Sequence, residues 1–342
     1  MEQYPFHSSF NDKYSVEARR ILRLLSENAR MSLSELSQRA GISRITVAKK
    51  LKALDEKLKI KYTLDINEAK LGLSTPNLII VKLEEKPDYS EIQAIFQNSY
   101  IPQAVAITKG DYDLLIYAVS PNTTEYAHWD KSMQLLLAKY GVVWQSSSVV
   151  HRQLGFFPLR NELIDRLSIN EKYKALIKLL NDNSRMSFQA LSQALGMHFN
   201  TVTYQFNKLM KSGYINRATI ALQPQPKDFV LMSFFAKYAP REGYEERSAK
   251  ARKAFMSDDK DSLVSRYLIC APLIGTYDFF TLGAFDDEKV AMKKDIMYHK
   301  SLFKEDKIKM KHAVIERMLL GNLPIRSIDT AKEYNTIRWS LQ

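Results

Sequence analysis

The chain has 342 residues, 45% of them hydrophobic and 26% charged, so it is long enough for several compact domains that each bury a core. It carries 50 Lys and Arg against 38 Asp and Glu, a formal net charge of +12. Because Lys and Arg release counterions when they neutralise phosphates, this excess favours a polyanionic partner. Membrane surfaces attract the same charge, so composition alone raises the case for nucleic acid only modestly.

Cysteine usage and hydropathy exclude several other classes of protein. A single cysteine, Cys270, can form neither an internal disulfide nor a cysteine-based metal site, which fits a reducing compartment. It lies in an apolar run that predicts a buried strand. The first residues lack the basic start and apolar core of a secretory signal, and no apolar run approaches the ~20 residues of a membrane-spanning helix. We therefore expect a cytoplasmic protein with no membrane partner and no metal site.

The chain contains an internal repeat. Residues 28–38 read NARMSLSELSQ and residues 183–193 read NSRMSFQALSQ. A second, fainter match pairs the G-x-Y-D motif of Gly110–Asp113 with that of Gly275–Asp278. The order along the chain is therefore a helical head, an α/β domain, a second head, a second α/β domain and a tail.

Three helices are predicted in the first head. Ser32, followed three residues later by Glu35, forms a capping-box pattern at the start of the second helix. Gly41 makes the turn that follows, and Ser43 caps a third helix whose core face begins at Val47. Two helices joined by a tight glycine turn are typical of a helix-turn-helix.

The outward face of this third helix predicts DNA contact. With Val47 inward and ~100° per residue, the exposed positions carry basic and hydroxyl side chains. In the major groove Arg can read guanine, whereas Lys and hydroxyls contact phosphates and base edges. A solvated, lysine-rich face without DNA is the alternative, but the glycine turn, the cap and the basic helix together favour DNA. The predicted DNA-binding residues are Ser43, Arg44, Thr46, Lys49, Lys50 and Lys52.

The segments after each head predict a ferredoxin-like domain. Residues 57–64 alternate apolar and polar side chains and predict a β-wing. A strand, helix, strand, strand, helix, strand order follows, which is the βαββαβ pattern of that fold. In the first copy these elements are expected at residues 77–83, 90–98, 103–108, 112–119, 123–140 and 142–152. In the second copy they are expected at residues 229–238, 244–255, 264–271, 277–285, 287–302 and 307–317.

The second head keeps the scaffold of the first and changes its surface. His198 and Phe199 stand where the first head has Ser43 and Arg44, and the outward face is polar and aromatic. Asn and Gln can pair with adenine, so this helix can read bases, although its attraction for phosphate is weaker. A copy that only packs or dimerises is the alternative. The predicted DNA-binding residues are Asn200, Thr201, Tyr204, Gln205 and Lys208.

The stretch from Val16 to Leu73 resembles the N-terminal half of the leucine-responsive (Lrp/AsnC) transcriptional regulators. The resemblance is carried by Asn28–Ser32, Gly41–Val47 and Leu71–Leu73, and the domain with Gly110–Asp113 resembles the family's effector-binding and oligomerisation domain. The chain departs from the family pattern in three places. These are Leu58 at the usual wing glycine, Lys50 for an arginine, and His198-Phe199 for Ser-Arg.

The resemblance implies an α+β fold in which two winged helix-turn-helix domains alternate with two ferredoxin-like domains. The heads are expected at residues 1–73 and 161–225, the effector/oligomerisation domains at 74–160 and 226–322, and a C-terminal tail at 323–342. The family's sheets pair between modules. This chain is therefore expected to be either an intramolecular pseudo-dimer or a homo-oligomer, a dimer of tandem chains in which unlike modules pair.

The resemblance also implies a small-molecule effector, an amino acid in many family members, near each G-x-Y-D turn. An ordinary β-turn glycine with a neighbouring Asp is the structural alternative. No cofactor is expected. The candidate effector-binding residues are Gly110, Asp111, Asp113, Gly275, Tyr277 and Asp278.

Together these observations predict a sequence-specific DNA-binding transcriptional regulator and not an enzyme. A siroheme-decarboxylase-like enzyme on the same scaffold is one alternative, but the histidines are scattered without metal-ligand spacing. They are His7, His128, His151, His198, His299 and His312. An architectural, low-specificity DNA binder is another alternative, because phosphate contacts serve both kinds of protein.

Overall fold

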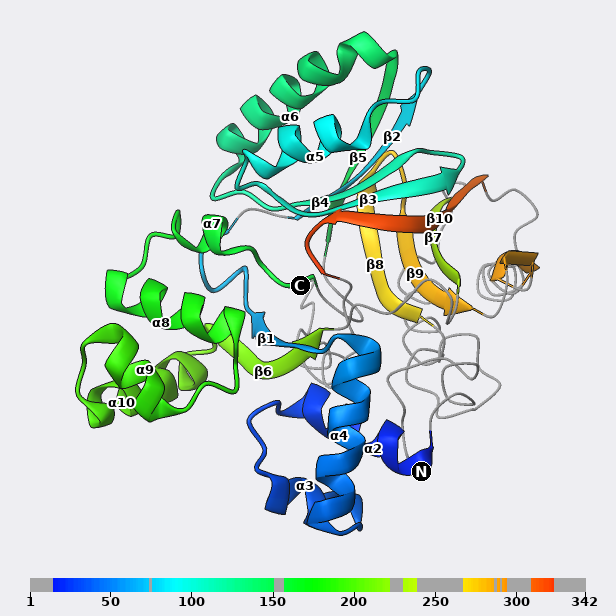
Figure 1. Ribbon diagram of the computed structural model, residues 1–342. Coiled ribbons are helices and arrows are strands. Elements are labelled where there is room, and N and C mark those ends of the chain that lie inside the picture. The colour runs from blue at the N-terminus through cyan, green and yellow to red at the C-terminus, as the bar shows by residue number, and fades with distance from the viewer. Residues whose placement is uncertain are drawn as a thin grey trace, which may run out of the picture.

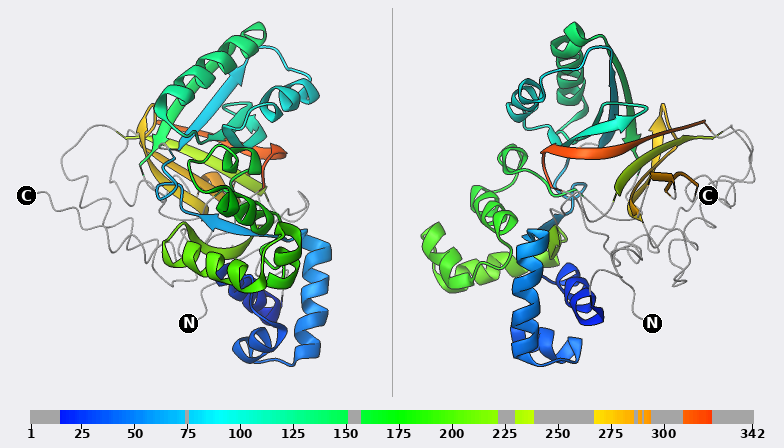
Figure 2. Two further views of the ribbon diagram at one scale, coloured as in Figure 1. Left: turned by 90° about the vertical axis from the view of Figure 1, so that its left-hand side faces the viewer. Right: turned by 45° about the vertical axis from the view of Figure 1, so that its right-hand side comes forward.

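Two helical heads lie on one side of a β-barrel, and helices α5 and α6 lie on the opposite side (Figures 1 and 2). This computed structural model describes residues 15–73, 76–150, 157–221, 230–238, 267–285, 288–289, 291–293 and 309–322. The predicted helix at residues 244–255 and the tail lie outside these ranges, as does most of the predicted helix at 287–302. None of the described helices is long and apolar enough to cross a membrane.

Each head is a three-helix unit followed by a strand. The predicted caps of the first head are confirmed: Ser32 Oγ accepts from the N–H of Glu35, and Ser43 Oγ accepts from that of Thr46. Gly41 makes the turn with φ 69°. The first head comprises α2 (Val16–Glu27), α3 (Leu33–Ala40), α4 (Arg44–Leu58) and β1 (Lys61–Ile66). The second comprises α8 (Glu171–Asp182), α9 (Phe188–Leu195), α10 (Phe199–Lys211) and β6 (Ile215–Ala221), preceded by the short α7 (Asn161–Ile164).

The strand after α4 begins later than the alternating pattern predicts. Leu58 is fully buried and keeps Lys57 and Leu58 in the helix, so the chain reverses at Lys59, whose φ is 48°. The strand also does not pair within its own head. β1 pairs antiparallel with β6 of the second head, from Lys61 opposite Ala221 to Ile66 opposite Ile215.

The first helix of each head packs on the strand of the other head. Helix α2 contacts β6 and helix α8 contacts β1. Two backbone hydrogen bonds mark this exchange, from Ala29 N to Ala218 O at 2.8 Å and from Ser184 N to Tyr62 O at 3.1 Å. The Arg30 guanidinium adds a bond of 2.6 Å to the carbonyl of Ser184. The heads therefore share one core and hold α4 and α10 in a fixed relation.

A buried ion pair joins the two heads. Arg217 on β6 lies 2.9 Å from Asp65 on β1, and Asp65 is fully buried. Asn216 Nδ2 donates to the second oxygen of Asp65 at 3.3 Å. A buried charge of this kind is tolerated only with its partner in place.

The α/β segments form strands that close into one barrel. The predicted strand and helix order of the first copy is confirmed, as are the four strands of the second. The first copy comprises β2 (Asn77–Leu83), α5 (Tyr89–Gln97), β3 (Pro102–Gly110), β4 (Leu114–Ala118), α6 (Thr123–Leu137), η1 (Ala138–Tyr140) and β5 (Val142–Val149). The second contributes β7 (Val230–Lys237), β8 (Tyr267–Gly275), β9 (Phe279–Phe285) and β10 (Lys309–Leu320).

The barrel order is β10-β3-β4-β2-β5-β8-β9-β7, with the ends joined. The last strand of each copy therefore pairs with the second strand of the other: β5 with β8, and β10 with β3. Each sheet closes the edges of its partner, which leaves no free strand edge in the barrel. The two modules thus pair inside one chain, which is one of the two arrangements that the sequence left open.

Side chains alternate between the two faces of the barrel wall, as strand geometry requires. Leu78 and Ile80 of β2 belong to the large core that includes the barrel interior. Ile79 and Val81 pack on the opposite face with Ile92 and other residues of α5 and α6. Cys270, on β8, is fully buried as predicted.

Replacing Asp65 with alanine tests the pairing of the heads. The change leaves Arg217 buried without its counter-charge, and we expect a loss of about 3–5 kcal/mol in the free energy of unfolding. Denaturant unfolding followed by circular dichroism measures this loss. Combining it with Arg217→Leu should restore most of the stability, because no unpaired charge remains. Losses that simply add in the double variant would contradict a coupled pair.

Candidate nucleic-acid interface

The start of α4 presents hydroxyl groups and an arginine at the surface. Ser43 Oγ caps the helix through the N–H of Thr46 at 3.1 Å and lies 2.9 Å from Thr46 Oγ1. Arg44 is exposed beside them. The cap fixes the first turn of the helix, which is the part that contacts base edges in a helix-turn-helix complex.

The centre of the exposed face of α4 is formed by Ile45, Lys49 and Lys52. Ile45 is 83% exposed, and both lysines are exposed. Within the described part of the chain, Arg44, Lys49 and Lys52 form no hydrogen bond or ion pair. Their charges are therefore available to a polyanion. Ile45 was not among the predicted site residues, although helical periodicity places it on this face.

Lys50 differs from the other basic residues of α4. Its ammonium lies 3.0 Å from Ser15 Oγ and 3.6 Å from the carboxylate of Glu17, at the start of α2. The backbone and Ser15 hydrogen bonds of Glu17, together with Lys50, lower the pKa of that carboxyl. Lys50 therefore fastens α4 to α2 and reaches DNA only by giving up these contacts.

Helix α10 presents a different surface in the same scaffold. Asn200, Thr201, Tyr204 and Lys208 are exposed, with Tyr204 at 65%. A hydrogen bond with the hydroxyl of Tyr173 raises the pKa of Lys208. The helix is capped by His198, whose Nδ1 accepts from the N–H of Asn200.

Gln205 does not lie on the open face of α10. It is half-buried, and its Oε1 is buried without a hydrogen-bond partner among the described residues. Asn207 and Lys211, by contrast, are exposed on the same side of the helix as Asn200. These two residues were absent from the predicted site, although the ~100° rotation per residue identifies them.

The G-x-Y-D glycines lie where the two repeats meet. A Cβ on Gly110 would lie 2.6 Å from the carbonyl oxygen of His312 on β10, and one on Gly275 would lie 3.1 Å from that of Ser146 on β5. Both glycines also have positive φ, 149° and 133°. Asp111 accepts a hydrogen bond from the N–H of His312 at 2.8 Å. The motif therefore lets a strand of the other repeat approach closely.

The last aspartate of each motif, Asp113 or Asp278, is engaged within its own repeat. Asp113 accepts from the N–H of Leu83 at 2.8 Å, and its other oxygen lies 3.2 Å from the ammonium of Lys82. Asp278 repeats the ion pair with Lys237 at 2.8 Å. These carboxylates hold the ends of β2 and β7 to the turn that precedes the next strand.

The motif tyrosines face the interior. Tyr112 is fully buried and its hydroxyl lies 2.6 Å from Ser233 Oγ on β7. The hydroxyl of Tyr277 donates to Gln145 Oε1 at 3.0 Å, and burial raises the pKa of Tyr277 to about 12. Both groups thus form hydrogen bonds across the repeats.

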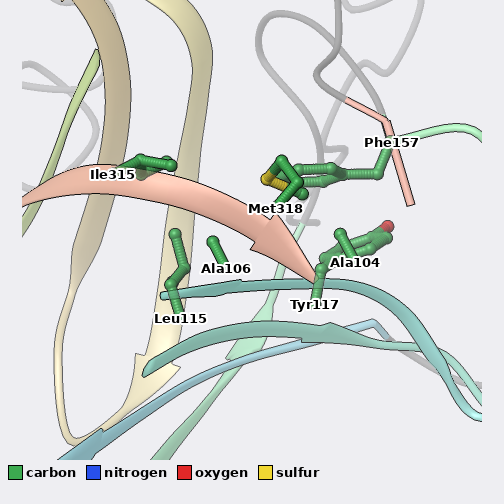
Figure 3. Close-up of a pocket in the computed structure, with 7 residues that line it drawn as sticks. All are labelled: Ala104, Ala106, Leu115, Tyr117, Phe157, Ile315 and Met318. Atoms are coloured by element: carbon green, nitrogen blue, oxygen red, sulfur yellow. The ribbon is translucent and has the colours of Figure 1, made fainter. Parts of the chain in front are cut away.

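The barrel interior near β3, β4 and β10 is nearly filled. Figure 3 shows Ile315 and Met318 on β10 above the side chains of β3 and β4. The cavity between them has a volume of about 10 Å³, which is room for one water molecule. It is lined by Ala104, Ala106, Leu115, Tyr117, Phe157, Ile315 and Met318.

Comparison with known proteins agrees with this geometry. The family of winged helix-turn-helix DNA-binding domains matches residues 18–57 and 169–216, the two heads. An uncharacterised HTH-type transcriptional regulator of Pyrococcus horikoshii is 32% identical over 110 residues, covering 31% of this chain and 73% of the relative. The HTH-type transcriptional regulator LrpA of the same organism is 41% identical over 96 residues, covering 28% of this chain and 67% of LrpA.

A solved structure matches nearly the full length of the chain. The siroheme decarboxylase NirDL superposes with a TM-score of 0.58 and 13% identity, covering 93% of this chain and 96% of that one. At this identity the likeness establishes the tandem fold alone.

Two winged helix-turn-helix heads joined to a paired α/β barrel define a tandem DNA-binding protein. The chain belongs to the Lrp/AsnC family of helix-turn-helix transcriptional regulators.

Removing Lys49 and Lys52 together should weaken DNA binding at all sequences. Each lysine that neutralises a phosphate contributes about 0.9 to the slope of log K against log salt. The slope of the double alanine variant should therefore be shallower by up to about two. Fluorescence anisotropy at several salt concentrations measures the slope. Lys131→Ala is the matched control, because Lys131 is exposed on α6, on the far side of the barrel (Figure 1). An unchanged slope would place the DNA contact elsewhere.

Proposed function

We propose that this chain is a sequence-specific transcriptional regulator in which α4 reads the major groove. The observation that carries the proposal is the exposed face of α4. There Arg44, Lys49 and Lys52 have no partner among the described residues and lie beside the capped helix start. Arg is suited to guanine and the lysines to flanking phosphates.

The joining of the heads supports this function. The β1–β6 pairing and the Asp65–Arg217 ion pair hold α4 and α10 together before DNA arrives. Heads that are already fixed lose less conformational freedom when they bind. One chain thus offers the two recognition helices that a symmetric regulator obtains by dimerisation. Association of tandem chains into a larger oligomer stays a prediction.

Small-molecule sensing at the G-x-Y-D turns also stays a prediction. The polar groups of Asp113, Tyr277 and Asp278 already bond within the chain, and Gly110 and Gly275 contact the other repeat. A ligand at either turn would have to replace these contacts. The barrel therefore serves first to hold the two repeats together.

A decarboxylase is the second candidate, favoured by the full-length likeness to NirDL. We infer that the chain is not an enzyme, because α4 keeps an exposed basic face that suits DNA. The purified protein should show no Soret absorption after incubation with an iron tetrapyrrole. A saturable Soret shift would support the enzyme.

Arg44→Ala separates a sequence-specific regulator from an architectural DNA binder. If Arg44 reads guanine, its loss should reduce discrimination at one base pair by about 1–3 kcal/mol while binding to random DNA falls much less. Binding to a selected site and to its single-base variants measures this. Lys49→Ala is the control, since a phosphate contact weakens all sequences alike. Equal losses for every DNA, together with continuous genomic coverage in footprinting, would favour the architectural role.

A further inference from the structure

The exposed faces of the two recognition helices differ at every central position. The repeat places Ile45, Lys49 and Lys52 of α4 at the same helical positions as Asn200, Tyr204 and Asn207 of α10. All six side chains are exposed. A hydrophobic and cationic face thus corresponds to an amide and aromatic face.

The N-terminal ends of the two helices also differ in charge: that of α4 is basic and that of α10 is not. Arg44 of α4 corresponds to Phe199 of α10, which is 47% exposed and packs edge-on against Phe188 at 6.3 Å between ring centroids. The first nine residues of α4 hold Arg44 and three lysines, whereas the basic residues of α10, Lys208 and Lys211, stand in its last turn. The part of α10 that would enter a groove therefore carries no positive side chain.

The core beneath these faces has not diverged in the same way. Val47 and Leu54 of α4 correspond to Val202 and Leu209 of α10, and all four are buried. The scaffold that presents the two faces is thus retained at these positions, while the exposed surface has changed.

The pairing of β1 with β6 holds the two unlike helices together in one unit. A symmetric dimer presents two identical recognition helices, because both come from one sequence. Here α4 and α10 belong to one chain and share one core, so the two unlike faces are always presented together.

We propose that one chain reads a non-palindromic site composed of two unlike half-sites. This rests on the proposed function of α4 and adds α10 as a second reader. The α4 half-site holds guanine for Arg44 and thymine methyl for Ile45, with strong phosphate contact. The α10 half-site holds adenine, read by the side-chain amides of Asn200 and Asn207.

Selection of binding sites from a random double-stranded DNA library with the full chain tests this. The expected result is one enriched motif with a guanine-containing half and an A·T-rich half of different sequence. The double variant Asn200→Ala with Asn207→Ala should reduce the preference for adenine in the A·T-rich half roughly tenfold. The base preference in the other half should not change. Gln193→Ala, an exposed amide on α9 away from this face, is the matched control.

Grafting the α4 face onto α10 provides a gain of function. Asn200→Ile, Tyr204→Lys and Asn207→Lys should change the preference of the A·T-rich half alone and raise the salt slope by up to about two. Adding Phe199→Arg should turn the motif into an inverted repeat of the guanine half. The triple variant keeps Phe199 against Phe188, so it tests the idea even if the quadruple variant does not fold.

The outcomes distinguish this inference from the proposed function. A palindromic motif from the wild-type chain, or a motif unchanged by both α10 variants, would overturn the proposal that α10 reads a second half-site. The proposal that α4 reads DNA sequence would stand. No enriched motif in any experiment would overturn both.

Discussion

Strand pairing between the two repeats is the constraint on which the rest of the structure depends. Each α/β sheet alone would expose two edges of unpaired N–H and C=O groups. The β5–β8 and β10–β3 pairs close these edges, and β1–β6 joins the heads in the same way. Neither repeat completes its own fold, so strand pairing fixes the two heads to each other and the two halves of the barrel to each other.

The G-x-Y-D motif serves this pairing at both junctions. Gly110 and Gly275 admit the neighbouring backbone, and Tyr112 and Tyr277 form hydrogen bonds with strands of the other repeat. The motif repeats because the junction repeats. A glycine and an aspartate that resemble a ligand turn in the sequence thus have a structural task in the fold.

Duplication within one chain allows the exposed residues of the two heads to diverge while their buried residues stay similar. Residues that face the core stay apolar in both heads, since packing admits few alternatives. Residues that face outward carry no such constraint and have diverged, from Lys49 and Lys52 to Tyr204 and Asn207. A homodimer presents two identical recognition helices, whereas this chain presents α4 and α10, whose exposed faces differ, in a fixed relation.

The sequence by itself determined the local elements and the repeat. Capping by Ser32 and Ser43, the turn at Gly41 and the strand order of the first α/β copy depend on neighbouring residues, which a pattern reveals. Tertiary structure alone decided which strands pair, because alternation marks a strand but not its partner. It also tied Lys50 to Ser15, 35 residues away, and buried Leu58, which delayed β1. Such contacts depend on how distant segments meet, which no local pattern records.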